Sequence, residues 1–357
     1  MTIRYAFAIV FLLAGASPGV AAEDGSGRFD AATLARDQDV IRVDGNRFVD
    51  ESGTTFVFRG VSIADPAKLL RDDQWSKRIF DAVRSWGANT VRLPVHPSAW
   101  REHGQSRYLE FIDDAVRWCN ELGMYVIVDW HSIGYLPAAK FTRDGYVTTW
   151  DETREFWNVV AERYAGIPTV AVYELFNEPT TSNGEFGERD WTEWKRYLEE
   201  MIDIVYAHDT DVIPLVAGFD WAYSLRPVRT APIEREGIAY ASHPYPQKER
   251  PQPPSAENFA AAWESAWGFV ADDYPMILTE LGWVREDGYG AHIPVINDGS
   301  YGPMIVDYME SKGISWVAWV FDPNWSPVLI TDWDFTPSEQ GEFFRAVMKG
   351  HEAAPDG

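Results

Sequence analysis

Short apolar runs alternate along this chain with longer segments in which apolar residues recur at helical spacing. From residue 58 onward this alternation predicts repeated units of β-strand, loop and amphipathic helix, which build parallel sheets. The number of such strands decides between an open sheet and a closed barrel. Eight strands are expected, at Phe58–Ile63, Thr90–Pro94, Tyr125–Asp129, Val170–Phe176, Ile213–Ala217, Ala239–His243, Met276–Glu280 and Trp316–Val320.

Eight parallel strands close a barrel, so the pattern favours an α/β chain folded as a (β/α)8 TIM barrel. A doubly wound open sheet would need a glycine-rich phosphate loop after an early strand, but the first strand is followed by Ala64-Asp65-Pro66. Between the fifth and sixth strands, residues 221–236 carry two prolines and little periodicity, so the helical pattern is weakest there. The other helices are expected at Trp75–Trp86, Tyr108–Leu122, Thr153–Tyr164, Asp190–His208, Ala256–Phe269, Gly302–Ser311 and Ser338–Met348.

The segments on either side of the barrel have different characters. Residues 1–22 have the pattern of a secretory signal peptide, with Arg4, an apolar core and a small-residue site after which we expect cleavage, at Ala22. Residues 23–39 are polar and predict an irregular tether. Alternation around Asp44-Gly45-Asn46 predicts a short β-ribbon that caps the bottom of the barrel. The catalytic barrel is expected over residues 40–350, and residues 351–357 form a C-terminal tail.

Composition narrows the classes of partner. The chain of 357 residues has a formal net charge of −24, which disfavours nucleic acid and anionic membrane surfaces as partners. With the signal peptide removed, we expect a secreted or periplasmic monomer that does not associate with a membrane. The 17 tryptophans include faces that can stack on sugar rings. The lone Cys119 cannot form a disulfide within the chain and is expected to be buried and inert.

Polar residues stand at the ends of several predicted strands that are otherwise apolar. The carboxyl ends of the strands form the active-site face of a barrel. Buried charges are costly unless they are paired, so residues of this kind need mutual compensation or a function. They are Arg92, Asp129-Trp130-His131, Asn177-Glu178, His243-Pro244-Tyr245, Glu280 and Trp319.

Two of the three carboxylic acids in this set come from strands that face one another across the barrel mouth. Glu178 follows the fourth strand and Glu280 ends the seventh. Two carboxyl groups that meet in a cleft are the equipment for glycoside hydrolysis. Glu174, deeper in the fourth strand, is interpreted as structural and without a comparable set of partners. The histidine and acid spacings contain no HExxH motif or similar cluster, so neither a metal nor another cofactor is predicted.

The ordered set of strand-end residues resembles glycoside hydrolase family 5, the cellulase-type barrel family, and the likeness extends from about Ile41 to Met348. The family has Arg on the second strand, His after the third, Asn-Glu on the fourth, His-x-Tyr on the sixth, Glu on the seventh and Trp on the eighth. The matching residues are Arg92, His131, Asn177, Glu178, His243, Tyr245, Glu280 and Trp319.

The resemblance implies a retaining mechanism in which Glu178 is the acid/base and Glu280 the nucleophile. Glu178 would then have to hold a proton, whereas Glu280 would have to be ionised, with Arg92 and Tyr245 donating hydrogen bonds to it. Retention requires carboxyl groups about 5–5.5 Å apart, and inversion about 6.5–9.5 Å. The separation of the two carboxyl groups therefore tests the assignment.

The resemblance also implies roles for the remaining residues of the set. Asn177 would bond the sugar 2-hydroxyl, and His131 and His243 would orient the substrate and the two carboxyl groups. Trp319 would form the floor beneath the sugar that is cleaved. Six further tryptophans in the predicted loops are candidate sugar-binding subsites, of which we expect two or three to serve: Trp100, Trp130, Trp150, Trp221, Trp283 and Trp325.

The expected function is an exported β-glycosidase acting on a β-linked polysaccharide or oligosaccharide, with an endo-β-1,4-glucanase of the cellulase type preferred. The loop 321–327 departs from the commoner cellulase pattern, which leaves β-mannanase, β-1,3-glucanase and exo-β-glycosidase activities open. Transglycosylation also stays open, because a sugar can replace water in the second step. The alternative outside enzymes is a noncatalytic carbohydrate-binding barrel, which both retained glutamates disfavour.

Overall fold

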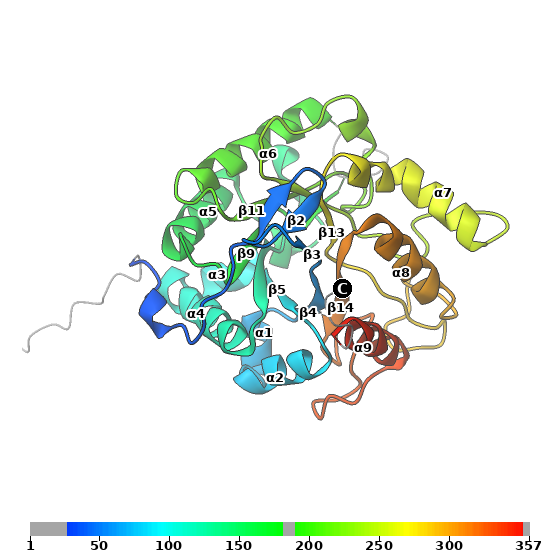
Figure 1. Ribbon diagram of the computed structural model, residues 1–357, viewed down its shortest axis with the longest axis horizontal. Coiled ribbons are helices and arrows are strands. Elements are labelled where there is room, and N and C mark those ends of the chain that lie inside the picture. Colours follow the sequence, from blue (N-terminus) through cyan, green and yellow to red (C-terminus); the bar gives the residue numbers. More distant parts are fainter. Residues whose placement is uncertain (1–26, 181–189, 353–357) are drawn as a thin grey trace, which may run out of the picture.

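Eight parallel strands close into a barrel in the computed structural model, which describes residues 27–180 and 190–352 (Figure 1). The predicted (β/α)8 TIM barrel is therefore confirmed. The predicted signal peptide lies outside the described residues, as does residue 353 onward of the predicted tail. In chain order the barrel strands are β4 (Arg59–Ile63), β5 (Thr90–Val95), β6 (Tyr125–Trp130), β9 (Val170–Glu174), β11 (Ile213–Ala217), β12 (Ala239–Ala241), β13 (Met276–Leu278) and β14 (Ser315–Phe321).

Helices surround the barrel at or near each predicted position. Two short helices, α1 (Pro66–Arg71) and α3 (Pro97–His103), were not predicted; each begins with a proline, which suits the first helical turn. Residues 221–236 contain only the short 3-10 helix η4 (Arg226–Arg229). The main helices are α2 (Lys77–Ser85), α4 (Gln105–Leu122), α5 (Trp150–Tyr164), α6 (Trp191–Tyr206), α7 (Ala256–Ala266), α8 (Tyr301–Lys312) and α9 (Glu339–Glu352).

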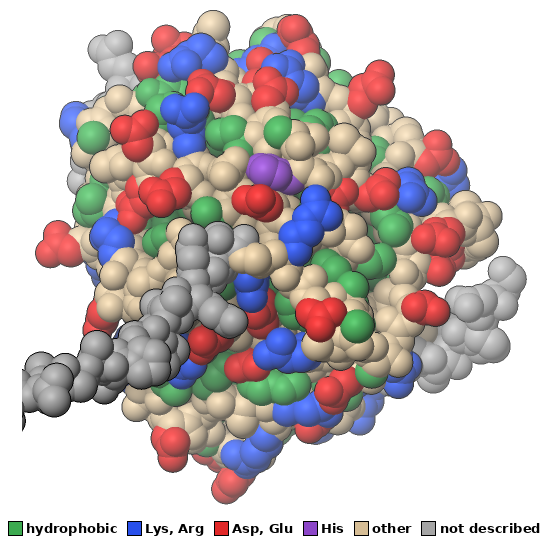
Figure 2. All heavy atoms as spheres, turned by 90° about the vertical axis from the view of Figure 1, so that its left-hand side faces the viewer, with side chains coloured by type: hydrophobic (Ala, Val, Ile, Leu, Met, Phe, Trp, Pro, Cys, Tyr) green, Lys and Arg blue, Asp and Glu red, His purple; other side chains and the backbone are tan. Residues whose placement is uncertain are grey.

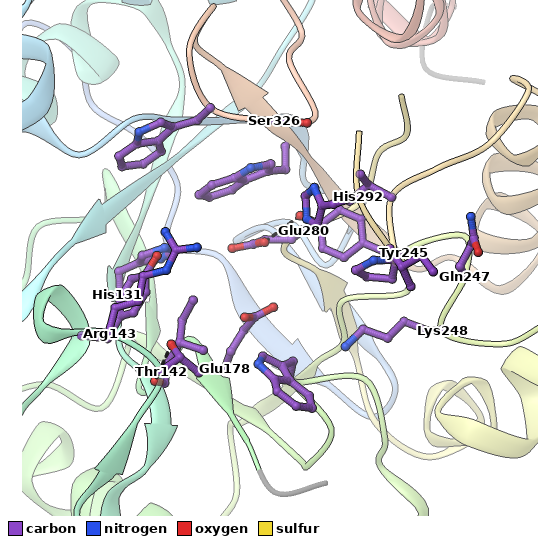
Figure 3. Close-up of a pocket in the computed structure, with 18 of the residues that line it drawn as sticks. His131, Thr142, Arg143, Glu178, Tyr245, Gln247, Lys248, Glu280, His292 and Ser326 are labelled. Atoms are coloured by element: carbon purple, nitrogen blue, oxygen red, sulfur yellow. Dashed lines mark hydrogen bonds between the residues drawn. The ribbon is translucent and has the colours of Figure 1, made fainter. Parts of the chain in front are cut away.

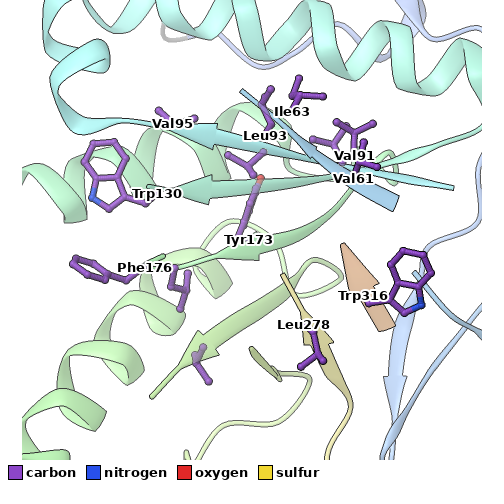
Figure 4. Close-up of a cluster of buried hydrophobic side chains, with 14 of the residues drawn as sticks. Val61, Ile63, Val91, Leu93, Val95, Trp130, Tyr173, Phe176, Leu278 and Trp316 are labelled. Carbon is purple, nitrogen blue, oxygen red and sulfur yellow. The ribbon is translucent and has the colours of Figure 1, made fainter. Parts of the chain in front are cut away.

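Strand alternation separates two apolar cores. Side chains such as Val61, Leu93 and Tyr173 face outward and pack against the helices (Figure 4). The intervening residues face into the barrel, where Ile127 and Leu215 belong to a second buried cluster. Successive side chains of a strand point to opposite faces, so a polar residue in register with the inner set is forced into the barrel interior.

The N-terminal ribbon closes the end of the barrel that lies opposite the active-site face, as predicted. It consists of the antiparallel strands β1 (Arg42–Asp44), β2 (Arg47–Val49) and β3 (Thr55–Phe56). Phe48 of the ribbon packs edge-on against Phe58 at the start of the first barrel strand, with ring centroids 5.2 Å apart. The ribbon therefore seals the inner core from water.

The described part of the predicted tether, residues 27–39, contains the short 3-10 helix η1 (Ala31–Thr33), is otherwise irregular, and lies against the barrel. Phe29 is buried, and its backbone N–H donates to the carbonyl of Arg163 at 2.8 Å. The side-chain oxygen of Asn120 accepts hydrogen bonds from the backbone N–H groups of Ala35 and Arg36 at 2.8 and 2.9 Å. This segment is consequently anchored to α4 and α5, and does not extend freely.

The thiol of Cys119 is buried, as expected, and one face of the surface (Figure 2) shows how the charged side chains are distributed. Acidic side chains are spread over the face in Figure 2 with basic ones between them, and no single basic patch is seen there. Cys119 is buried in α4, and burial raises the pKa of its thiol. Within residues 27–180 and 190–352, no helix has the length and apolar character needed to cross a bilayer.

Candidate active site

A cleft of about 800 Å³ opens at the carboxyl ends of the barrel strands (Figure 3). Glu178 and Glu280 both line it, and their carboxyl groups point toward one another. The walls come from the loops that follow most of the strands. Among the other lining residues are His131, Arg143, Tyr146, Trp221, Tyr245, Lys248, Ile293, Trp319, Asn324 and Trp325.

The chain around Glu178 leaves the barrel before the acid is reached. Strand β9 ends at Glu174, two residues earlier than predicted. The backbone N–H groups of Asn177 and Glu178 then donate to the carbonyls of Trp130 and Ser132, both at 3.1 Å. Glu178 begins the short strand β10 (Glu178–Pro179), which pairs with β7 (Ile133–Tyr135) above the barrel mouth. This change of partner places the carboxyl group at the floor of the cleft.

The two carboxyl groups are close. One oxygen of Glu178, one oxygen of Glu280 and a ring nitrogen of His243 lie within 4.8 Å of one another. Glu178 is 8% exposed and Glu280 5% exposed, so both are largely shielded from solvent. An inverting pair needs about 6.5–9.5 Å between its carboxyl groups, to leave room for a water molecule. The two acids therefore bring one oxygen each closer together than that range.

Arg92 ties several strand ends together beneath the cleft. Its side chain is fully buried, and its Nη1 donates to Oε1 of Glu280 at 3.1 Å. Its Nη2 donates to Oδ1 of Asn177 at 2.6 Å and lies 3.0 Å from Oδ2 of Asp129. The surrounding carboxylates outweigh the effect of burial and raise the pKa of Arg92. A permanently charged, planar donor suits a site that must hold several oxygens in fixed positions.

The interpretation of Glu174 as a residue without partners was wrong. Its Oε2 accepts from Nε of Arg92 at 2.6 Å, and its Oε1 accepts from the hydroxyl of Thr279 at 2.7 Å. Burial would raise the pKa of Glu174, but Arg92 and His243 outweigh it and lower the pKa to about 2. Glu174 is thus the ionised counterion of Arg92. It leaves the remaining guanidinium donors to face Glu280, Asn177 and Asp129.

Glu280 receives the two hydrogen bonds expected of an ionised nucleophile. The hydroxyl of Tyr245 donates to its Oε2 at 2.7 Å, and Arg92 donates to its other oxygen. Burial raises the pKa of Glu280 above its ordinary value and the nearby Glu178 adds to the rise, while His243, Arg92 and Tyr245 oppose it. A reaction that needs this carboxylate should accordingly lose rate at acidic pH, as Glu280 takes up a proton.

His243 is held by hydrogen bonds at both ring nitrogens. The Thr279 hydroxyl gives its proton to Glu174, so it must accept from Nε2 of His243, which is 3.0 Å away. Nε2 therefore carries a proton. Nδ1 lies 3.0 Å from Oε1 of Glu178 and either donates to the ionised acid or accepts from the protonated one. The His243–Glu178 pair thus holds a proton beside the cleft, and no ring nitrogen of His243 is left over for a metal.

The charge of His243 predicts a pH-dependent contribution to stability. Burial would lower its pKa, but Glu280, Glu174 and Glu178 outweigh it and raise the pKa from 6.5 to about 9. A raised pKa stabilises the fold below the unfolded value, and that contribution is lost as pH rises from 6.5 to about 9. We expect the free energy of unfolding to fall by on the order of 3 kcal/mol over this range, measured by urea denaturation.

The matched variants are His243→Gln and His208→Gln. His208 lies near the surface, where its Nε2 meets Oδ1 of Asn158 at 2.9 Å. The difference in unfolding free energy between wild type and His243→Gln should shrink as pH rises, whereas that for His208→Gln should stay flat. A constant difference for His243→Gln across this range would contradict a charged His243.

His131, Trp319 and Trp325 form a stacked wall of the cleft. The rings of His131 and Trp319 are nearly parallel, at 3° with centroids 5.5 Å apart, and Trp325 continues the stack at 12° and 5.9 Å. Nδ1 of His131 is 2.6 Å from Oδ2 of Asp129, and burial with the neighbouring positive groups lowers the pKa of His131 well below its ordinary value. His131 is therefore neutral, and its orientation is set by Asp129.

The structure separates the six candidate subsite tryptophans into two groups. Trp221 and Trp325 line the cleft. Trp150 is half-buried on α5 and packs against Tyr197 with centroids 4.6 Å apart. Trp100, Trp130 and Trp283 are buried in the outer core. Two of the six tryptophans, Trp221 and Trp325, therefore lie where they can contact a bound sugar.

Several residues at or beside the cleft were given no functional role from the sequence. His96 follows β5, bonds Asp65 through Nδ1 at 3.0 Å, and packs against Trp325 with centroids 5.4 Å apart. Lys248 lines the cleft from the loop after β12. Glu174 carried a usable signal, since it shares the inward register of β9 with Val172 and so had to meet a cation. For Lys248, in a polar loop, no comparable pattern exists.

Comparison with known proteins agrees with this geometry. Residues 49–324 match the model of the family described as cellulase (glycosyl hydrolase family 5). The chain is 26% identical over 267 residues to endoglucanase A of Butyrivibrio fibrisolvens, covering 70% of this chain and 53% of that protein. It is 22% identical over 360 residues to an endoglucanase of Paenibacillus polymyxa, covering 85% and 86% of the two chains. The match thus spans about half of the Butyrivibrio enzyme and most of the Paenibacillus one.

Solved structures agree in fold. The β-glucanase SdGluc5_26A of Saccharophagus degradans, solved in complex with cellotetraose, is 58% identical with a TM-score of 0.90, covering 91% of this chain and 97% of that one. The endoglucanase Cel5A catalytic domain of Thermobifida fusca is 22% identical with a TM-score of 0.69, covering 87% and 97%, and supports the fold. The ordered strand-end residues, the closed barrel and the family match lead to one conclusion: this chain belongs to glycoside hydrolase family 5, the cellulase family.

Proposed function

We propose that the protein is a retaining endo-β-glucanase that cleaves internal β-1,4 bonds of a glucan by double displacement. The observation that carries this proposal is the pair of carboxyl oxygens within 4.8 Å in the cleft, with Arg92 and Tyr245 on Glu280 and His243 on Glu178. The asymmetric hydrogen bonding gives the two acids different tasks. Two donors favour the ionised form of Glu280, while His243 shares a proton with Glu178.

In the first step, an oxygen of Glu280 attacks C1 of the sugar above Trp319, and the bond from C1 to the glycosidic oxygen breaks. The proton held by the Glu178–His243 pair goes from Glu178 to that oxygen, so the departing chain leaves as a neutral alcohol. Arg92 and Tyr245 keep Glu280 oriented during the attack. The product of this step is a glycosyl ester of Glu280.

In the second step, Glu178 as carboxylate removes a proton from water, and the water oxygen attacks C1 from the face that the leaving group vacated. The ester bond breaks, Glu280 returns as carboxylate, and the configuration at C1 is again β. Asn177 can assist both steps. Arg92 occupies its Oδ1, and its buried Nδ2 has no partner among the described residues, so it is available to donate to a substrate hydroxyl.

A glucan substrate is supported by the neighbours and by the cleft. The Saccharophagus β-glucanase was solved with cellotetraose, and the curated relatives named above are endoglucanases. Trp319 and Trp325 line the cleft together with Glu280, and Trp221 is joined to the strand that carries Glu178, its backbone N–H donating to the Pro179 carbonyl at 3.1 Å. Aromatic faces on both sides of the scissile bond suit a chain that extends in both directions.

The proposal is tested by product analysis on a panel of cellulose-type glucan, mixed-linkage β-glucan, β-1,3-glucan, β-mannan and aryl β-cellobioside. We expect internal cleavage of β-1,4-containing glucans, with a rapid fall in viscosity. Proton NMR of the first product should show the β-anomer before mutarotation. An α-anomer would overturn the retaining assignment, and wild-type protein that binds the glucans without cleaving any of the panel would favour a carbohydrate-binding barrel.

We further propose that the chain is exported. The support is the sequence pattern of residues 1–22, with a basic start, an apolar stretch and a small-residue site. An exported enzyme would meet polymeric glucan, which cannot enter a cell. Mass spectrometry of the mature protein should find Glu23 at its N-terminus, and an intact N-terminus in the cytoplasmic fraction would contradict export.

A further inference from the structure

A buried lysine lies beside the loop 321–327, the loop whose sequence departs from the commoner cellulase pattern. Lys68, on the short helix α1, is 7% exposed, and its Nζ pairs with Oδ2 of Asp322, a fully buried residue directly after β14. Nζ also lies 2.8 Å from Oδ2 of Asp72, one helical turn further along the chain. Taking charged groups out of water is costly, and the proposed mechanism uses neither Lys68 nor Asp322. This buried pair therefore needs another explanation.

The second oxygen of Asp322 holds the loop that carries Trp325. Its Oδ1 accepts from the backbone N–H groups of Asn324 and Trp325 at 2.7 and 3.0 Å. The ends of the loop are joined as well, because the N–H of Val320 donates to the carbonyl of Pro327 at 3.0 Å. A short loop that is closed at its base and bonded to a buried carboxylate has few conformations left. The backbone at Trp325 is consequently fixed from below.

Lys68 also contacts the indole rings themselves. Its Nζ lies 5.8 Å from the ring centroid of Trp325 and 5.1 Å from that of Trp333. An ammonium group within about 6 Å of an aromatic face is attracted to it. Trp325 is half-buried and lines the cleft. Lys68 thus holds the ring of Trp325 directly and its backbone through Asp322.

The start of α1 supports the same ring through His96. Asp65, the N-cap of α1, accepts from the backbone N–H of His96 at 2.9 Å and from the Tyr108 hydroxyl at 2.8 Å. Burial would raise the pKa of Asp65, but His96 and Tyr108 outweigh it and lower that pKa. The ionised carboxylate therefore accepts from Nδ1 of His96 as well, at 3.0 Å. The ring of His96, oriented in this way, meets Trp325 edge-on with centroids 5.4 Å apart.

Trp325 lies on the donor side of the scissile bond. In the closed barrel, β14 and β9 lie opposite one another, four strands apart in either direction. Glu178 follows β9 and protonates the departing oxygen in the proposed mechanism, so the leaving group lies on its side. Figure 3 shows Glu280 between Glu178 and Ser326, the neighbour of Trp325. Trp325 consequently faces the part of the substrate that stays on Glu280, next to the sugar above Trp319.

We propose that Lys68 and Asp322 are positioning residues that fix Trp325 against the second donor sugar, the one adjacent to the sugar above Trp319. The inference rests on the proposed function and adds to it a preference for donors of two or more sugars. Because the buried pair holds the ring before substrate arrives, little conformational freedom is lost on binding. Loss of Lys68 leaves Asp322 without its buried cation, so the loop can shift although Trp325 itself is unchanged.

The test compares 2,4-dinitrophenyl β-cellobioside with 2,4-dinitrophenyl β-glucoside, which share a leaving group and differ by the second donor sugar. The ratio of their kcat/KM values, the donor-sugar ratio, measures what that sugar contributes. We expect Trp325→Ala to lower this ratio by about tenfold and Lys68→Met by about three- to tenfold. Lys68→Arg, which keeps the charge, should lose less. In a Trp325→Ala background, Lys68→Met should change the ratio by less than about twofold, because Lys68 acts through that ring.

The matched control is Lys77→Met, which should leave the donor-sugar ratio unchanged. Lys77 pairs with Asp81 at 2.7 Å one helical turn away, as Lys68 does with Asp72, but on the outer helix α2. Equal losses of kcat/KM on both glycosides in Lys68→Met would show a merely structural role and overturn the proposal. Effects of Lys68→Met and Trp325→Ala that multiply would overturn it as well.

Wild-type protein separates this proposal from the proposed function. Protein that cleaves neither the cellobioside nor cellotetraose would refute the proposed function. A donor-sugar ratio near one, or cleavage of cellotetraose without cleavage of the cellobioside, would overturn only the positioning of a second donor sugar.

Thermal unfolding of each variant identifies any that do not fold. If Lys68→Met is one of them, the double variant Lys68→Met/Asp322→Asn carries the comparison, since it leaves neither member of the buried pair charged. Asparagine keeps an oxygen for the N–H groups of Asn324 and Trp325, but the link to α1 is lost. We expect the donor-sugar ratio of the double variant to fall by at least about threefold, and an unchanged ratio would overturn the proposal.

Discussion

Replacing Glu280 with Gln should lower kcat for cello-oligosaccharide hydrolysis by at least about 10⁴-fold while leaving substrate binding measurable. The amide removes the attacking carboxylate but keeps the size of the side chain. Its single oxygen can accept from Arg92 in place of Oε1, which now lies 3.1 Å from Nη1, and its N–H can donate to the Tyr245 hydroxyl, which now donates to Oε2 at 2.7 Å. Initial rates with cellotetraose and calorimetric titration with the same sugar would measure the two effects separately.

The matched control for this change is Glu342→Gln, an exposed glutamate on α9 that pairs with Arg345. It should behave as wild type. A second variant identifies the role: Glu280→Ala with added azide should release an α-configured glycosyl azide, because azide attacks from the face that the nucleophile occupied. A β-configured azide, or retention of more than about a hundredth of wild-type kcat in Glu280→Gln, would refute Glu280 as the nucleophile.

Replacing Glu178 with Ala should lower kcat/KM for cellotetraose by about 10²- to 10⁴-fold, the usual contribution of a general acid. The loss should be far smaller for formation of the glycosyl ester from β-cellobiosyl fluoride, whose leaving group needs no proton. The second step would still lack its base, so the ester on Glu280 should accumulate. Pre-steady-state release of fluoride followed by mass spectrometry of the protein measures both events.

Azide again distinguishes the roles of the two acids. In Glu178→Ala, azide can enter the space left by the carboxyl group and attack the ester without a base, which should restore turnover and yield a β-configured glycosyl azide. The opposite configurations expected for the two variants form an internal check. If Glu178→Ala lost activity on the fluoride and on cellotetraose to the same extent, the acid/base assignment would fail.

The cluster of charged side chains beneath the cleft explains how Glu178 and Glu280 can differ in protonation although they lie close together. Arg92 is neutralised first by Glu174, at 2.6 Å, and its other donors reach Glu280 and Asn177. His243 is held between Thr279 and Glu178 and carries its charge to a pKa of about 9. Buried charges that are paired in this way can remain charged, whereas isolated ones would neutralise. The contact between His243 and Glu178 determines which proton is available to the leaving group.

The strand-and-helix alternation was sufficient to predict the barrel. A fully buried parallel strand is an apolar run, which is visible in one sequence, and eight such runs specify closure. The strand-end residues Arg92, Glu178 and Glu280 were also identifiable, because charged and polar groups rarely interrupt buried strands without a purpose. Their order along the chain was enough to recognise the family.

Tertiary structure alone decided which groups meet. The inward register of Glu174 indicated that it needs a positively charged partner, but not which one, because Arg92 and Thr279 come from strands far away in sequence. The six loop tryptophans look alike in the sequence, yet Trp100 and Trp130 are core while Trp221 and Trp325 reach the cleft. A buried indole and a sugar-binding indole have the same side chain, so only the packing around them separates the two.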